Sequence, residues 1–184
     1  MSAPELIELC AARGGAEALA RQARERGTDL PATGRVVVGT EALALCVRPQ
    51  RWLLLAWAGS AVGTGTGSEL CAAWQRTIGS LGAAVDLSSA YMMFALSGPS
   101  VRERLALGCR LDLHPREFPV GRAAATTMAQ VPVILAALPA GMLMLTPSST
   151  GRHFEEWLAA TGQGGALVPQ SSPGLIELCR SRSE

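Results

Sequence analysis

Lysine is absent from this chain of 184 residues, so all 16 of its Lys-or-Arg positions are arginines. Together with abundant alanine and glycine, this absence indicates a bias in genome composition rather than a function. Fifteen acidic residues leave a formal net charge of +1. Proteins that bind nucleic acid usually present a strongly basic face, so the charge balance gives no support for that class.

Long apolar runs are also missing. The longest candidate, Val131–Leu138, has the length of a strand and falls far short of the ~20 apolar residues that a membrane span requires. The first ten residues, MSAPELIELC, lack the basic and then apolar pattern of a secretory signal. We therefore expect a cytoplasmic protein with no membrane association. Its apolar content of 48% is high for a monomer and predicts that part of its surface is buried against partners.

Motifs that carry chemistry are absent as well. Residues 59–67 are glycine-rich but match no phosphate-binding motif, and Ser97–Ser100 lacks the G-x-S-x-G nucleophile elbow. The two histidines, His114 and His153, have no carboxylate or thiol at ligand spacing. No CxxC pair exists among the cysteines, which are odd in number and far apart: Cys10, Cys46, Cys71, Cys109 and Cys179. We expect reduced thiols, and no catalytic, cofactor-binding or metal-binding residue in this chain.

The first 34 residues are predicted to form a helical N-terminal arm and a linker. Ser2 and Glu5 have the spacing of a capping box, and apolar residues then recur on one helical face before Gly14. Ala16–Arg26 is a second candidate helix, and 27–34 has the composition of a linker. The segment PELIELC at 4–10 nearly repeats as PGLIELC at 173–179; chance and docking of two amphipathic helices to similar grooves are both open explanations.

The remaining pattern predicts an α+β domain over 35–163, followed by a C-terminal tail over 164–184. Strands are expected at 35–38, 42–47, 52–57, 90–96 and 141–146, with one long or two short strands at 123–137. Helices are expected from Ser68 to Leu81, at 101–107 and at 152–160, the last capped by Ser149 or Thr150. This alternation, with hairpin-like returns, favours two ferredoxin-like (split βαβ) plait halves. A strand–loop–helix unit also recurs weakly, as WLLLAW with SELCAAW and as MLMLTP with RHFEEWL.

The segment Leu111–Gly121, LDLHPREFPVG, is predicted to be an ordered loop because its two prolines exclude regular structure. His114 stands between Asp112 and Pro115, and we interpret it as a residue that holds the loop by hydrogen bonds.

The charges around this loop are of mixed sign: Arg110, Asp112, Arg116 and Glu117. Nearby arginines stabilise ionised carboxylates, which disfavours a catalytic acid here. We expect ion pairs that fix the loop or cross a subunit interface. Arg122 follows directly and suits an interface too.

Taken together, the stretch from Asp86 to Leu158 resembles the gamma subunit of heterotetrameric sarcosine oxidase. The matching pieces are ALSGPSVRERLALGC (Ala95–Cys109), LDLHPREFPVG (Leu111–Gly121), ATTMAQVPVIL (Ala125–Leu135), MLMLTPSS (Met142–Ser149), FEEWL (Phe154–Leu158) and, earlier, PQRWLLL (Pro49–Leu55). The loop is the most specific of these pieces.

The resemblance implies a duplicated plait similar to the folate-binding domain of aminomethyltransferases. It implies a non-catalytic accessory subunit of a complex that oxidatively demethylates sarcosine or a related N-methyl amino acid. FAD, FMN, NAD and tetrahydrofolate would belong to the larger alpha and beta flavoprotein subunits, and zinc to a small delta subunit, with no cofactor in this chain. The candidate residues for the subunit interface are Asp112, His114, Arg116, Phe118 and Arg122.

A second reading is a stand-alone folate-binding or iron–sulfur-maintenance protein of the same fold. That subgroup usually carries a K-G-C-aromatic-x-G-Q motif, and this chain has no lysine. A stand-alone aminomethyltransferase is disfavoured because the chain is short and shows no counterpart of the catalytic aspartate motif.

Overall fold

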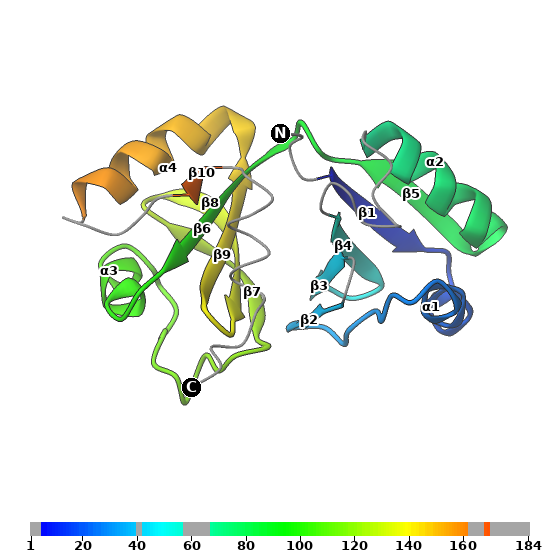
Figure 1. Ribbon diagram of the computed structural model, residues 1–184, viewed down its shortest axis with the longest axis horizontal. Coiled ribbons are helices and arrows are strands. Elements are labelled where there is room, and N and C mark those ends of the chain that lie inside the picture. The colour runs from blue at the N-terminus through cyan, green and yellow to red at the C-terminus, as the bar shows by residue number, and fades with distance from the viewer. Residues whose placement is uncertain (1–4, 40–41, 57–66, 162–167, 170–184) are drawn as a thin grey trace. The chain divides into compact units, whose positions relative to one another are not determined.

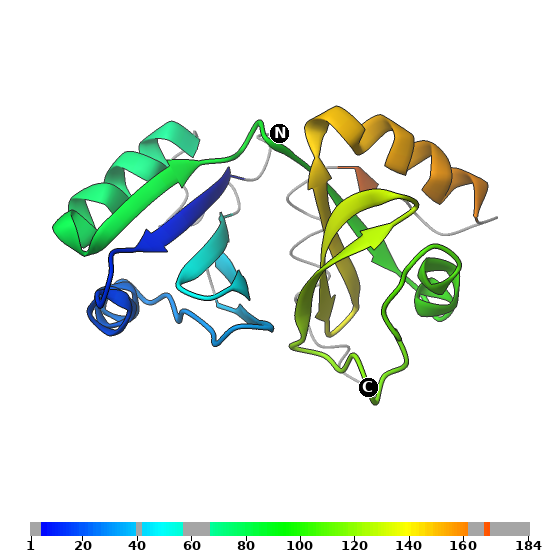
Figure 2. The same cartoon turned by 180° about the vertical axis from the view of Figure 1, so that it is seen from behind.

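The computed structural model describes residues 5–39, 42–56, 67–161 and 168–169. The chain divides into two compact units, Met1–Ser88 and Ser89–Glu184, which are described one at a time below (Figures 1 and 2). Within the described ranges, no helix has both the length and the apolar character needed to cross a membrane.

The first unit is a five-stranded antiparallel sheet in the order β2-β3-β4-β1-β5. Side chains of two helices, among them Leu19, Leu70 and Trp74, pack on one face of this sheet against Ile7 and Leu54. Its elements are β1 (Glu5–Ala11), α1 (Ala16–Glu25), β2 (Arg35–Val38), β3 (Ala42–Arg48), β4 (Arg51–Ala56), α2 (Gly67–Ile78), the 3-10 turn η1 (Gly79–Leu81) and β5 (Gly82–Asp86).

The predicted N-terminal helix is wrong. Residues Glu5–Ala11 form β1, an interior strand that pairs with both β4 and β5. Leu6, Ile7 and Leu9 are all fully buried, so β1 is apolar on both faces, and such a strand has no alternating pattern to distinguish it from a helix. Residues 5–34 are therefore part of the first unit and not a separate arm. The second copy of the motif, PGLIELC at 173–179, lies outside the described residues.

The second unit is also a five-stranded antiparallel sheet, in the order β10-β6-β9-β8-β7. Its elements are β6 (Tyr91–Ser97), α3 (Val101–Ala106), β7 (Ala123–Met128), β8 (Val131–Leu138), β9 (Gly141–Pro147), α4 (Ser148–Ala160) and β10 (Val168–Pro169). Residues 123–137 thus form two strands, joined by a two-residue turn. Ala129 and Gln130 both have positive φ there, 49° and 66°, as a tight hairpin turn requires.

The two units repeat the same plan. In chain order each runs strand, helix, three strands, helix, strand, and the corresponding strands occupy the same places in the two sheets. Thus β1 corresponds to β6, β4 to β9 and α2 to α4. The weak sequence parallel between WLLLAW–SELCAAW and MLMLTP–RHFEEWL falls on the corresponding pairs β4–α2 and β9–α4. The predicted loop at 59–67 between the first pair lies outside the described residues, apart from Gly67, where α2 begins.

Two helix starts differ from the prediction. Helix α4 begins at Ser148, directly after Pro147, and no side chain caps it. The hydroxyl of Thr150 instead donates to the Pro147 carbonyl oxygen at 3.1 Å, so this residue lies inside the first turn. Proline is tolerated at a helix entrance because its missing N–H would have no partner there. Helix α2 likewise begins at Gly67, which places Ser68 inside it.

The core of the second unit gathers around α4. Phe154 is fully buried and meets Phe94 edge to face, with ring centroids 5.2 Å apart, and it stacks on Trp157 at 5.7 Å. Gly108, just after α3, faces this tryptophan, and a Cβ at Gly108 would lie 2.4 Å from its Cζ2 atom. Gly108 is therefore required for close packing and not for a left-handed backbone.

Candidate functional site

The loop Leu111–Gly121 leaves α3 and leads into β7. Leu113 and Phe118 are each only 3% exposed and belong to the core of the second unit. Between them the chain turns outward, so His114, Arg116 and their neighbours are exposed. Phe118 was expected at a subunit interface. Its ring lies instead in the core of the second unit, since burial of a large aromatic side chain stabilises the fold.

Arg102 of α3 ties the two ends of this loop together. Its Nη1 atom donates to the carbonyl oxygens of Leu113, at 2.6 Å, and Phe118, at 2.7 Å. Burial lowers the pKa of its guanidinium, but an arginine stays charged in proteins. The sequence did not indicate this role of Arg102, because its acceptors are backbone carbonyl groups, which every residue carries.

Hydrogen bonds within the loop confirm the structural interpretation of His114. The Asp112 Oδ1 atom accepts from the His114 backbone N–H at 2.8 Å, a local turn that aspartate often makes. The His114 Nδ1 atom accepts from the Arg116 backbone N–H at 3.3 Å, and its carbonyl accepts from Glu117 and Phe118, both at 2.9 Å. His114 therefore stabilises a turn.

No ion pair among the described residues fixes the loop, so this half of the expectation was wrong, and pairs across a subunit interface stay a prediction. The salt bridges within the described residues are Arg24–Asp29, Arg51–Glu8 and Arg152–Glu156. The charged side chains of the loop are all exposed, where an ion pair adds little to stability. Two apolar anchors, Leu113 and Phe118, and one arginine, Arg102, hold the loop instead.

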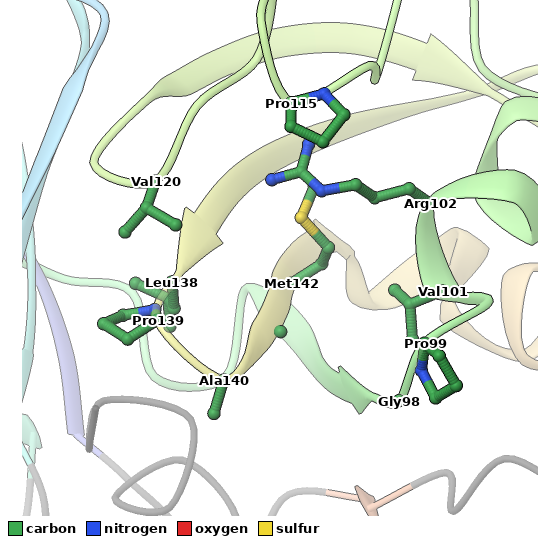
Figure 3. Close-up of a pocket in the computed structure, with 11 residues that line it drawn as sticks. Gly98, Pro99, Val101, Arg102, Pro115, Val120, Leu138, Pro139, Ala140 and Met142 are labelled. Atoms are coloured by element: carbon green, nitrogen blue, oxygen red, sulfur yellow. The ribbon is translucent and has the colours of Figure 1, made fainter. Parts of the chain in front are cut away.

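A pocket of about 360 Å³ opens beside the loop. Figure 3 shows Arg102 reaching into it from α3, Val120 from the loop, and Pro139 and Met142 from the β8–β9 hairpin. The full lining is Gly98, Pro99, Val101, Arg102, Pro115, Val120, Leu138, Pro139, Ala140, Gly141 and Met142. Arg102 carries the one charge of this lining.

Outside the loop, the surroundings of the histidine and cysteine side chains favour structural roles. His153 is exposed, with its Nε2 atom 3.3 Å from the Ala129 carbonyl oxygen. Burial raises the pKa of the Cys10 and Cys71 thiols, and Glu8 raises that of Cys10 further. A raised pKa lowers the thiolate fraction and with it the nucleophilicity. In the ranges that the structure describes, no three His, Cys, Asp or Glu residues are grouped to hold a metal.

Comparison with known proteins decides the family. A model described as the sarcosine oxidase, gamma subunit family matches residues 11–160. The chain belongs to this family. The resemblance drawn from the loop and its flanking elements is thereby confirmed.

Two curated relatives carry the same description. The sarcosine oxidase subunit gamma of an Arthrobacter species is 41% identical over 111 residues, covering 59% of this chain and 51% of that protein. The subunit gamma of Corynebacterium sp. strain P-1 is 35% identical over 149 residues, covering 79% and 68%. The chain thus spans about half the length of the first relative and about two thirds of the second.

A solved structure extends the likeness to the fold. The heterotetrameric sarcosine oxidase from Corynebacterium sp. U-96, in complex with pyrrole 2-carboxylate, contains a chain that matches with a TM-score of 0.70 and 26% identity. The match covers all of this chain and 85% of that one.

Proposed function

We propose that this chain is the non-catalytic gamma subunit of a heterotetrameric sarcosine oxidase, or of a related oxidase or dehydrogenase of N-methyl amino acids, and that it supports assembly of the complex. The observation that carries the proposal is the family match over residues 11–160. The match of the whole chain to a chain of the solved heterotetramer supports it.

The proposed partners are the larger alpha and beta flavoprotein subunits and the small zinc-binding delta subunit. FAD, FMN, NAD and tetrahydrofolate would act on the larger subunits and zinc on the small one, in the cytoplasm. This chain would contribute surface rather than chemistry. In support, His114 and Asp112 are engaged in turn hydrogen bonds, and burial raises the pKa of the Cys10 and Cys71 thiols.

Strand order supports a plait in each unit. Without the edge strand β2, the first sheet reads β3-β4-β1-β5, and without β7 the second reads β8-β9-β6-β10. This is the order of a split βαβ plait, in which the two strands flanking each helix are not neighbours in the sheet. We infer two ferredoxin-like plaits, each with one added edge strand, similar to the folate-binding domain of aminomethyltransferases.

The exposed residues in and beside the loop are the proposed contact with the larger subunits. Asp112, His114, Arg116 and Arg122 are all exposed, and none takes part in an ion pair among the described residues. Their charges can therefore pair across an interface without first breaking an internal pair. Phe118 would serve this surface indirectly, by holding the loop from below.

Co-expression with the larger subunits from the same source tests the proposal. We expect the chain to copurify with them in fixed stoichiometry, and the yield of active complex to fall when the chain is omitted. Assembly of fully active flavoprotein subunits without the chain would overturn the proposal. Titration of the isolated chain with reduced folate tests the alternative, a stand-alone folate-binding or iron–sulfur-maintenance protein. Tight binding would favour that alternative.

A further inference from the structure

The pocket beside the loop has a rigid and mostly apolar wall. Three prolines line it, Pro99, Pro115 and Pro139, and proline restricts its own backbone and that of the residue before it. Its floor includes Leu138 and Met142, which are 2% and 1% exposed. Its volume of about 360 Å³ lies at the small end of the range for binding pockets. A wall of this kind is formed before any ligand arrives, so little ordering is needed on binding.

The charge of the pocket is uncompensated. Arg102 bonds two neutral carbonyl oxygens, and no salt bridge joins it to a carboxylate in the described part of the chain. Burial lowers its pKa, which means that its charged form is partly desolvated. A desolvated cation without a counter-ion attracts an anion strongly. Apart from Arg102, the surrounding segment 98–122 holds four arginines and three carboxylates, so its net charge has the same sign.

The rim of the pocket presents apolar surface to solvent. Val120 is 55% exposed. It follows Pro119 in the loop that Arg102 holds at both ends. Its side chain lies beside the cavity in Figure 3. Apolar surface next to an unpaired charge suits an occupant that is itself apolar with an acidic group attached.

We propose that this pocket receives a segment of a partner subunit that presents a carboxylate next to a large apolar side chain. The carboxylate would pair with Arg102, and the apolar side chain would pack on Val120, Pro139 and Met142. The proposal rests on the proposed function, since it names the chemistry by which a partner would recognise this chain. It commits to a protein segment because the family is that of an oligomer subunit and because the rim is apolar.

A competition for incorporation tests this docking. The tagged large subunit is co-expressed with equal amounts of the natural chain and of one variant, and intact-mass spectrometry gives the ratio recovered. Val120→Asp places a negative charge against the proposed carboxylate. Leu107→Asp is the matched control, because Leu107 is 73% exposed and does not line the pocket. Val120→Arg removes the same apolar contact but keeps the favourable sign of charge.

We expect Val120→Asp to be incorporated about tenfold less than Leu107→Asp, which corresponds to about 1.4 kcal/mol, and Val120→Arg to fall between them. Circular dichroism of each isolated variant checks that it is folded. Equal incorporation of Val120→Asp and Leu107→Asp would overturn the docking while leaving the proposed function intact. If the natural chain itself is not incorporated, the proposed function fails and the docking with it.

A photo-crosslinking residue at Ala140, on the hairpin side of the pocket, identifies the occupant. We expect a cross-link to a large-subunit peptide that contains Asp, Glu or a chain terminus beside an apolar residue. A cross-link to a second copy of this chain, or to a peptide without a carboxylate, would contradict the proposal.

Discussion

At the scale of single residues, Arg102 decides the shape of the loop. Replacing it with alanine removes two charge-assisted hydrogen bonds and leaves the Leu113 and Phe118 carbonyls without their donor. We expect Arg102→Ala to lower the free energy of unfolding by about 2 kcal/mol. Chemical denaturation measures it, with the exposed Arg110→Ala as a control that should stay within about 0.5 kcal/mol of the natural chain. Equal losses in the two variants would show that Arg102 does not anchor the loop.

Cys10 shows how a neighbouring carboxylate controls a thiol. Burial and the Glu8 carboxylate raise its pKa, so at pH 8 little thiolate is present. Glu8→Gln removes the negative charge and lowers that pKa, so we expect Cys10 to be alkylated faster by iodoacetamide at this pH. Peptide mapping gives the rate, and Cys71, whose pKa is raised by burial and Asp86 instead, is the internal control. An unchanged rate at Cys10 would contradict the assigned cause.

The loop residues show what the sequence can predict at this scale. Proline positions predicted an irregular but ordered segment, and His114 was correctly interpreted as structural, because both conclusions depend on local chemistry. The role of Arg102 and the burial of Phe118 depend on contacts between segments far apart in the chain. Nothing in the residue types nearby distinguishes an arginine bonded to carbonyls from one in solvent.

At the scale of elements, the residue that follows α3, Gly108, packs closely against Trp157 of α4. A Cβ at Gly108 would lie within 3.1 Å of three atoms of the Trp157 indole, and that ring is stacked on buried Phe154. We expect Gly108→Ala to cost about 1–3 kcal/mol of stability through overpacking. In a Trp157→Phe background the cost should shrink, because the benzene part of the indole is gone. A double-mutant cycle measures this coupling, and an additive result would contradict it.

Strand β1 marks the limit of pattern reasoning for elements. Helices α1 and α3 and most strands were predicted near their observed bounds, because their apolar periodicity is clear. The LIELC segment was assigned to a helix because the spacing of Leu6, Leu9 and Cys10 fits a helical face. Pairing with β4 and β5 overrides that tendency, and such pairing partners, more than 40 residues away, cannot be identified from a single sequence.

At the scale of the whole molecule, charge and apolar surface together predict poor solubility for the isolated chain. The net charge is only +1, so molecules repel each other weakly. Val37 and Val85, on the edge strands β2 and β5 of the first sheet, are 36% and 43% exposed. An exposed apolar edge strand is a template for aggregation. Among the described residues no strand pairs with the outer side of β2 or β5, so we expect the isolated chain to associate through these two edges of the first sheet.

The double variant Val37→Arg, Val85→Arg tests this view. It adds two charges and places each on a sheet edge, where arginine's long side chain can extend into solvent. We expect light scattering to show less self-association and a higher soluble yield at neutral pH, with little change in the free energy of unfolding, since both sites are on the surface. Adding salt should reverse part of the gain, because it screens the new repulsion. A double variant with Leu107→Arg and Gln130→Arg adds the same charge at exposed sites of the second unit, which are not part of the first sheet. If that control gains as much solubility, net charge alone accounts for the effect, and the edges of the first sheet are not where the isolated chain associates.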